Sequence, residues 1–146
     1  MPSAALLERT LHSEIPLSQA MGIRVAGYDG RCLRLAAPLA PNINHKLTAF
    51  GGSLYSLAVL CGWGLLHLKL AEAGLHKHIV IQEGSIRYLH PLNQEMVAEC
   101  CVDDSELGRF LRMLKKHDRA RLSLAVAIGK EGQPAVEFSG RYVVHG

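Results

Sequence analysis

The sequence predicts an α+β fold in which an antiparallel sheet wraps around one long helix. Residues 53–73 contain no proline and are rich in leucine and alanine, which favours a single long helix. The segments on both sides alternate apolar and polar side chains with the period of half-buried strands. An antiparallel sheet that hides one face against the helix satisfies this order of elements.

The size and composition are those of one globular domain, which we assign to residues 1–146. The chain has 146 residues, of which 49% are apolar and 20% are charged. The formal charge of +3 is too small to indicate nucleic-acid binding by itself. The N-terminus lacks a basic segment followed by an apolar core, so we expect no signal peptide and a cytoplasmic location.

The cysteines form no CxxC pair; they are Cys32, Cys61, Cys100 and Cys101. We interpret all four as reduced thiols in the core of a cytoplasmic protein. Cys100 and Cys101 are adjacent, so on a strand their side chains point to opposite faces. A nucleophilic Cys61 is an alternative that we do not favour.

A helix and a strand pair are predicted before the long helix. Ser3 is the expected cap of the first helix, and the proline after Ile15 ends it. Its apolar residues share one face and are Leu6, Leu7, Leu11 and Ile15. Residues 21–28 and 31–37 predict two strands joined at Asp29-Gly30, a strong hairpin signal.

The long helix carries apolar residues on every side, which predicts burial almost all round. Gly62 and Gly64 are tolerated inside a helix where another backbone or a ligand comes close. Gly74 is a suitable residue to end it. Residues 47–68 are also long enough to cross a membrane, but the strands on both sides would then lie in different compartments. We therefore expect a core helix and no membrane partner.

The second half predicts four strands at residues 78–89, 95–102, 122–129 and 135–144. Residues 105–117 predict an amphipathic helix with Ser105 as cap and with Phe110, Leu111 and Leu114 inward. The sheet leaves an edge strand that a second copy can pair with. We therefore expect a homodimer or a dimer of dimers.

Short motifs in this order resemble a known family. They are Ile15-Pro16-Leu17, Met21-Gly22-Ile23, Asn44 followed by Phe50-Gly51-Gly52-Ser53-Leu54-Tyr55, and Gly84-Ser85-Ile86-Arg87-Tyr88-Leu89. The order of elements resembles the hotdog fold, in which a curled antiparallel sheet wraps a central helix. The motifs resemble the thioesterase-like YiiD C-terminal family, which includes malonyl-acyl-carrier-protein decarboxylases. The resemblance implies a substrate acylated on coenzyme A or on an acyl carrier protein, with no other cofactor.

Two positions depart from the motif of hydrolytic hotdog enzymes. The histidine before the glycine pair is Phe50, and the helix aspartate that serves as base or nucleophile falls on Val59. A valine cannot activate water. Unless Glu83 substitutes for it, hydrolysis lacks its main chemical group.

Decarboxylation of a malonyl thioester does not require that carboxylate. It needs fixed donors to the carbonyl oxygen, on which an enolate charge develops, and a dry pocket for the leaving carboxylate. The start of the long helix supplies backbone N–H groups, and Gly51 and Gly52 allow close approach. We therefore predict Asn44 and Gly52 as catalytic residues, with the Asn44 amide as a donor.

Further residues are predicted to bind substrate: Asn42, His45, Phe50, Gly51, Ser53, Glu83 and Ser85. Several have structural alternatives. Asn42 and Asn44 can simply make turn hydrogen bonds, and Ser53 can satisfy first-turn N–H groups. Glu83 and Ser85 share one face of their strand, which reaches a partner's site or faces solvent.

Two other groups of polar residues have weaker functional interpretations. His76 and His78 lack a third ligand, so we predict no metal site. The basic stretch 109–121 is usually a solvated helix face, but it can also bind an acidic carrier protein or coenzyme A phosphates. Its low aromatic content argues against nucleic acid.

The function predicted first is decarboxylation of malonyl-acyl carrier protein to acetyl-acyl carrier protein, which primes fatty-acid synthesis. The first alternative is an acyl thioesterase in which Glu83 or an asparagine-held water replaces the helix carboxylate. The second is a non-catalytic domain that binds an acyl thioester or a partner.

Overall fold

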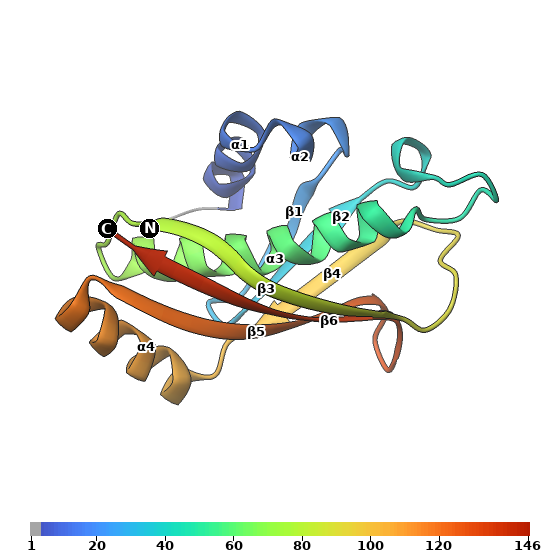
Figure 1. The fold of residues 1–146 in the computed structure, drawn as a ribbon. Helices are drawn as coiled ribbons and strands as arrows, with labels where there is room; N and C mark the ends of the chain where they lie inside the picture. The colour runs from blue at the N-terminus through green and yellow to red at the C-terminus, as the bar shows by residue number, and fades with distance from the viewer. Residues whose placement is uncertain (1–3) are drawn as a thin grey trace.

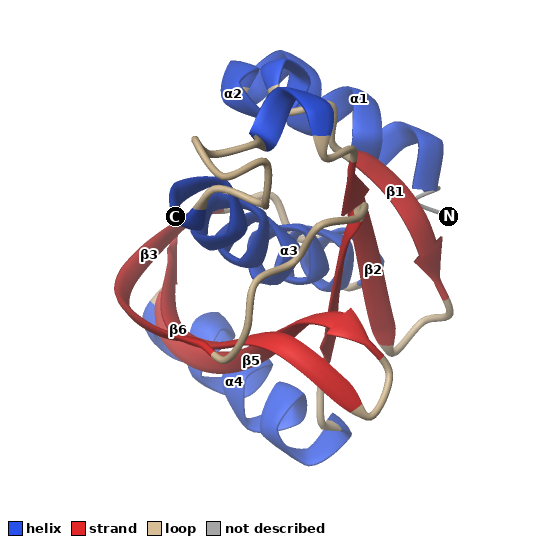
Figure 2. Cartoon of the chain, turned by 90° about the vertical axis from the view of Figure 1, so that its right-hand side faces the viewer, coloured by secondary structure: helices blue, strands red, loops and turns tan. Residues whose placement is uncertain are grey.

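A curved antiparallel sheet encloses the long helix α3 (Gly51–Glu72) in the computed structural model, which describes residues 4–146 (Figures 1 and 2). Its strand order is β1-β2-β4-β5-β6-β3. The strands are β1 (Arg24–Tyr28), β2 (Cys32–Ala37), β3 (His78–Tyr88), β4 (Met96–Cys101), β5 (Arg119–Lys130) and β6 (Gln133–His145). The predicted α+β fold, with the sheet around a central helix, is confirmed.

The shorter helices cover two different sides of this core. Helices α1 (Ala4–Glu14) and α2 (Pro16–Ala20) lie over the side of α3 that the sheet leaves open (Figure 2). Helix α4 (Asp104–His117) packs against β5 at the bottom of both views, whereas α1 lies at the top (Figures 1 and 2). A single 3-10 turn, η1 (Ala40–Asn42), lies in the loop before α3.

Two predicted boundaries are wrong for local reasons. The first strand begins at Arg24 rather than residue 21, because the segment after Ile15 forms the short helix α2 with proline in its first turn. Helix α4 is capped by Asp103 rather than Ser105, and the Asp103 carboxylate accepts the Glu106 N–H at 3.0 Å. The cap predicted at Ser3 lies outside the described residues.

Two further boundaries differ in the second half of the sheet. The fifth strand begins at Arg119, three residues earlier than predicted, because Asp118 adopts a left-handed conformation (φ 54°) and ends α4 directly before it. The last strand spans Gln133–His145 and is longer than predicted at both ends.

The glycines of α3 are explained by packing against the sheet. A Cβ atom at Gly62 would lie 2.2 Å from the hydroxyl oxygen of Tyr142, which is buried on β6. That hydroxyl donates to the Val59 carbonyl at 2.7 Å, so helix and strand meet through one hydrogen bond. A Cβ atom at Gly64 would lie 3.0 Å from Leu33. Both glycines therefore admit side chains of neighbouring elements rather than a ligand.

The length and composition of α3 alone would allow a membrane span, but 61% of its apolar window is buried inside the fold. Core helices of globular proteins have the same character. Along β5 the inward residues alternate as predicted, and Leu122, Leu124, Val126 and Ile128 are all buried.

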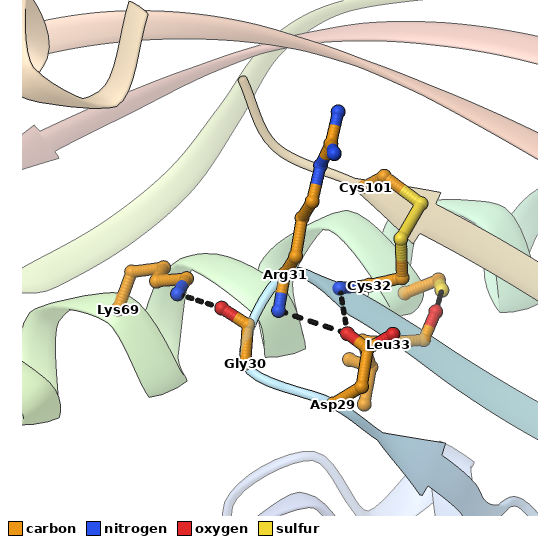
Figure 3. The surroundings of a disulfide bond; sticks show 8 residues. Asp29, Gly30, Arg31, Cys32, Leu33, Lys69 and Cys101 are labelled. Atoms are coloured by element: carbon orange, nitrogen blue, oxygen red, sulfur yellow. Dashed lines mark hydrogen bonds between the residues drawn. A yellow bond between two sulfur atoms is a disulfide. The ribbon is translucent and has the colours of Figure 1, made fainter. Parts of the chain in front are cut away.

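The prediction of four reduced thiols is wrong for two of them. Cys32 and Cys101 face each other on β2 and β4, with Cα atoms 4.0 Å apart, and form a disulfide (Figure 3). Cys61 and Cys100 are free and buried. Burial raises the pKa of both thiols, that of Cys100 to about 12, so neither is a ready nucleophile.

Candidate active site at the start of the long helix

The loop before α3 is fixed by a buried asparagine. Asn42 is 3% exposed, and its Nδ2 donates to the carbonyls of Met21 at 2.9 Å and Pro38 at 2.8 Å. Its own carbonyl accepts the Phe50 N–H at 2.8 Å. Asn42 therefore holds the first residue before α3 in place, and the structure does not bring its amide to the surface.

Asn44 closes the tight turn that follows. Its Oδ1 accepts the N–H groups of Lys46 at 2.8 Å and Thr48 at 3.1 Å. Its Nδ2 donates to the Thr48 hydroxyl at 2.8 Å, and Leu47 inside the turn has a φ of 64°. An amide nitrogen carries two hydrogens, and in residues 4–146 the second has no acceptor. Asn44 thus makes the turn contacts of the structural alternative and keeps one N–H available.

The first turn of α3 has no side-chain cap. Phe50 occupies the N-cap position in an extended conformation, and the first turn contains no acidic residue. Within the described chain, the N–H groups of Gly51, Gly52 and Ser53 have no acceptor. Aligned N–H groups and the positive end of the helix dipole favour an anionic oxygen at this place.

Two aromatic side chains frame the helix start. The Tyr88 hydroxyl, at the end of β3, donates to the Gly51 carbonyl at 2.9 Å. The Phe50 ring lies over Gly52, since a Cβ atom there would be 2.5 Å from it. Desolvation raises the pKa of Tyr88, which therefore stays a neutral donor at neutral pH. Sequence reasoning gave Tyr88 no role, because only the return of β3 toward α3 brings it here.

Exposed apolar side chains lie around this point, beside the exposed His45 and Lys46. Five exposed hydrophobic side chains belong to the loop, the helix start and the end of β3: Ile43, Leu47, Phe50, Tyr88 and Leu89. We call these residues the apolar rim. Exposed clusters of this kind usually mark a binding surface.

The other predicted residues are divided between this site and the far side of the sheet. His45 is an exposed loop residue next to Asn44, and Ser53 lies half-buried in the first turn. Glu83 and Ser85 lie on the sheet face away from α3, because the intervening Gly84 faces Tyr55 on the helix. Glu83 forms an ion pair with Arg141 at 3.4 Å. Within one protomer, neither Glu83 nor Ser85 meets the start of α3.

Helix α3 itself carries no carboxylate near its start. Glu72, in the last turn, is the single acidic residue of that helix. Val59, at the position of the catalytic aspartate in the motif, packs half-buried against the core. Among the described residues, no three His, Cys, Asp or Glu side chains gather to hold a metal ion.

A separate groove of about 700 Å³ runs beside the second half of α3. It lies between α1, α3 and the start of β3, and its polar residues include His67, His76 and His78. The His67 ring stacks on Trp63 with centroids 5.1 Å apart. Desolvation lowers the pKa of His67, so the groove wall is neutral there at pH 7.

Comparisons with known proteins agree on one family. A family model described as "Putative thioesterase (yiiD_Cterm)" matches residues 4–146. A solved Chlorobaculum tepidum protein of unknown function is 38% identical, with 97% of this chain and 93% of that chain covered and a TM-score of 0.93. A putative thioesterase from Shewanella oneidensis is 32% identical over 98% of this chain and 97% of that chain, with a TM-score of 0.85. A probable thioesterase from Pseudomonas aeruginosa, 21% identical over 99% and 96% of the two chains, shares the fold with a TM-score of 0.84.

Proposed function

The chain belongs to the YiiD C-terminal family of thioesterase-like hotdog proteins, and from that premise we propose that it acts on an acyl thioester held at the start of α3. The observation that carries the proposal is the first turn of α3, which contains no carboxylate and has three N–H groups without a partner in residues 4–146. Such a turn binds a thioester oxygen on which negative charge develops. The pantetheine arm of the substrate is the only cofactor that this chemistry requires.

The reaction that we propose first is decarboxylation of a malonyl thioester. The bond between the carboxylate carbon and C2 breaks, carbon dioxide leaves, and the electron pair moves through C2 onto the thioester oxygen as an enolate. C2 then takes a proton from water to give the acetyl thioester. The free Asn44 N–H and the first-turn N–H groups stabilise the enolate oxygen. The half-buried Val59 leaves the malonyl carboxylate without a repelling charge.

The apolar rim supports this choice. Its exposed side chains give the leaving carboxylate a poorly solvated setting once substrate covers them. A carboxylate in such surroundings loses hydration, whereas neutral carbon dioxide loses little, so burial favours the product side.

A second copy of the chain would complete the site. Strand β1 is covered by α1, since Glu8 Oε1 accepts the Val25 N–H at 2.8 Å and His12 Nε2 donates to the Ile23 carbonyl at 2.7 Å. Strand β3, at the other edge, pairs only with β6 in the described chain. Antiparallel pairing of two β3 strands about their middle puts His78 of one protomer beside the end of β3 in its partner. The groove along α3 then adjoins the partner's helix start.

Sedimentation velocity at assay concentration tests this assembly. We expect a dimer or a dimer of dimers. A monomer that turns over substrate as fast as the assembled protein contradicts a site shared between protomers.

Hydrolysis is the second candidate, because the family and the Shewanella oneidensis neighbour carry the description of thioesterases. It requires a water activated without the helix carboxylate, held by Asn44. A product assay separates the two reactions. Incubation with malonyl-acyl carrier protein, followed by mass spectrometry of the intact carrier, is expected to show loss of carbon dioxide with the acetyl group retained. Release of the free carrier thiol instead supports hydrolysis, and an unchanged malonyl carrier contradicts decarboxylation and shows that malonyl carrier is not hydrolysed.

A further inference from the structure

A set of basic side chains on α4 and the start of β5 lies apart from the candidate active site. Its members are Arg109, Arg112, Lys115, Lys116, Arg119 and Arg121, and all of them are exposed. Five other basic residues of the described chain form ion pairs with acidic neighbours: Arg24, Lys69, Lys77, Arg87 and Arg141. None of the set does so within residues 4–146. We call the set the basic face.

The helix dipole explains only part of this charge. Lys115 and Lys116 stand in the last turn of α4, where cations offset the negative end of the dipole. Arg109 and Arg112 stand earlier in the helix, and Arg121 is on a strand, so the dipole gives no reason for them. These arginines need another explanation.

Two of these arginines, Arg109 and Arg121, lie beside a surface hollow with an apolar base. Helical spacing puts Arg109, Arg112, Met113 and Lys116 on the side of α4 opposite the buried Phe110 and Leu114. A surface hollow of about 420 Å³ lies between Arg109, Met113 and Arg121, with Phe110 and Leu122 at its base and the exposed Glu106 also on its wall. Met113 is 50% exposed beside it. Cations around a flexible apolar side chain match the usual anatomy of a protein-binding surface.

The carrier of the substrate is the occupant that fits this chemistry. We propose that the basic face docks the acidic surface of an acyl carrier protein, with Met113 as its apolar contact; this inference rests on the proposed function. The cations of α4 spread over about two helical turns, about 11 Å. That stripe suits carboxylates on a protein surface better than the compact phosphates of coenzyme A. Within the basic face there is no aromatic side chain on which a nucleic-acid base could stack.

The position of the basic face agrees with delivery to the shared site. Helix α4 lies toward the end of the molecule at which α3 finishes (Figure 1). In the proposed dimer the partner's helix start comes to that same end. Strand β5 and the partner's β3 are then separated by β6 and β3, about 14 Å in all. A carrier docked on one protomer would thus serve the site of the other.

Charge reversal with a matched control tests the docking. The test protein carries Arg109→Glu, Arg112→Glu and Arg121→Glu. The control carries Arg9→Glu, Arg31→Glu and Lys130→Glu, three exposed basic residues without ion pairs in the described chain. Both proteins have a formal charge of −3 instead of +3, so they differ only in where the charge changed. Thermal melting of both checks that they fold.

Two readouts distinguish failure of docking from failure of the proposed function. Binding of unacylated holo-carrier by fluorescence anisotropy needs no turnover, and we expect Kd to rise about tenfold or more in the test protein alone. KM for malonyl carrier is expected to rise in parallel, with turnover of malonyl-coenzyme A unchanged. Equal weakening in both variants, or no carrier binding by the natural protein, overturns the docking proposal. Carrier binding that depends on the basic face without any turnover leaves docking supported and removes the decarboxylase.

Discussion

The two ends of α3 are completed in opposite ways. At its end, Gly74 has a φ of 72°, and the N–H groups of Gly74 and Leu75 bond back to the carbonyls of Ala71 and Leu70. At its start, no side chain of residues 4–146 caps the N–H groups after Phe50. A tyrosine hydroxyl stands at each end, but Tyr28 donates to the Glu72 carboxylate, whereas Tyr88 donates to the Gly51 carbonyl and leaves the N–H groups open.

This difference separates stability from binding within one helix. The finished end is also tied to the first hairpin, because Lys69 donates to the Gly30 carbonyl (Figure 3). Side-chain caps are worth about 1 kcal/mol, so an uncapped start forgoes stability that a serine or aspartate at position 50 would supply. We therefore expect changes at the start to lower turnover and changes at the end to lower stability.

The largest expected effect is on turnover, from Asn44→Asp. The aspartate keeps the oxygen that accepts the Lys46 and Thr48 N–H groups, but it loses the free donor and adds a negative charge. We expect kcat for malonyl carrier to fall roughly 100- to 1,000-fold, about 3–4 kcal/mol, as for loss of an oxyanion donor. Mass spectrometry of the carrier in samples quenched at successive times measures kcat. A loss under tenfold would remove Asn44 from the catalytic assignment.

The next effect uses the glycine pair. Gly52→Ala adds a methyl group against the Phe50 ring, beside the exposed N–H groups. Alanine is the better helix former by up to about 1 kcal/mol, so we expect unchanged or higher stability. We expect turnover to fall about tenfold, about 1.4 kcal/mol, because the thioester can no longer approach the backbone closely.

Gly108→Ala in α4 is the control for that change. Its methyl group would meet only the end of the flexible Arg112 side chain, at 3.4 Å. It gives a gain in helix propensity away from the start of α3, and both variants are assayed with malonyl-coenzyme A because Arg112 belongs to the basic face. Equal turnover in the two variants would show that the start of α3 need not be open.

The third effect belongs to the finished end. Tyr28→Phe removes the hydroxyl that donates to Glu72 and leaves the ring in place. We expect the free energy of unfolding to fall by about 1 kcal/mol, less than for a buried charged hydrogen bond, because solvent screens this pair. Urea unfolding measures it. Turnover is expected to stay unchanged, and a fall in kcat would mean that the two ends are coupled.

Local patterns in the sequence predicted the parts of this arrangement that depend on near neighbours. The turn at Asp29-Gly30 is one, since Asp29 accepts the Arg31 and Cys32 N–H groups at 2.9 and 2.7 Å. Gly74 is another. The disulfide was missed because it depends on the register of β2 against β4, which no single segment encodes.

The candidate site was only partly predictable for the same reason. The alternation of side chains along a strand correctly predicted that Glu83 and Ser85 share one face of β3. It did not predict on which side of the sheet that face lies. The asparagine loop was found from its composition. Its hydrogen bonds give Asn42 and Asn44 different roles. They depend on contacts with Met21 and Thr48 that the spacing of residues alone does not show.

The smallest effect is a pH dependence at the finished end of α3. Desolvation, followed by the hydrogen bond to Glu72 and its charge, raises the pKa of Tyr28 above its usual value near 10. A group whose pKa is raised by folding contributes its full stabilisation at pH values below its usual pKa. That contribution is lost as the pH rises above the usual pKa. The deficit in unfolding free energy of Tyr28→Phe relative to the natural protein should therefore shrink between pH 9 and pH 11 (about one unit on either side of the usual tyrosine value).

The thiols and Tyr142 also titrate at high pH, but they are common to both proteins and cancel in the difference. Urea unfolding at the two pH values gives the result, and a constant deficit would mean that the pKa of Tyr28 is not raised in the folded protein.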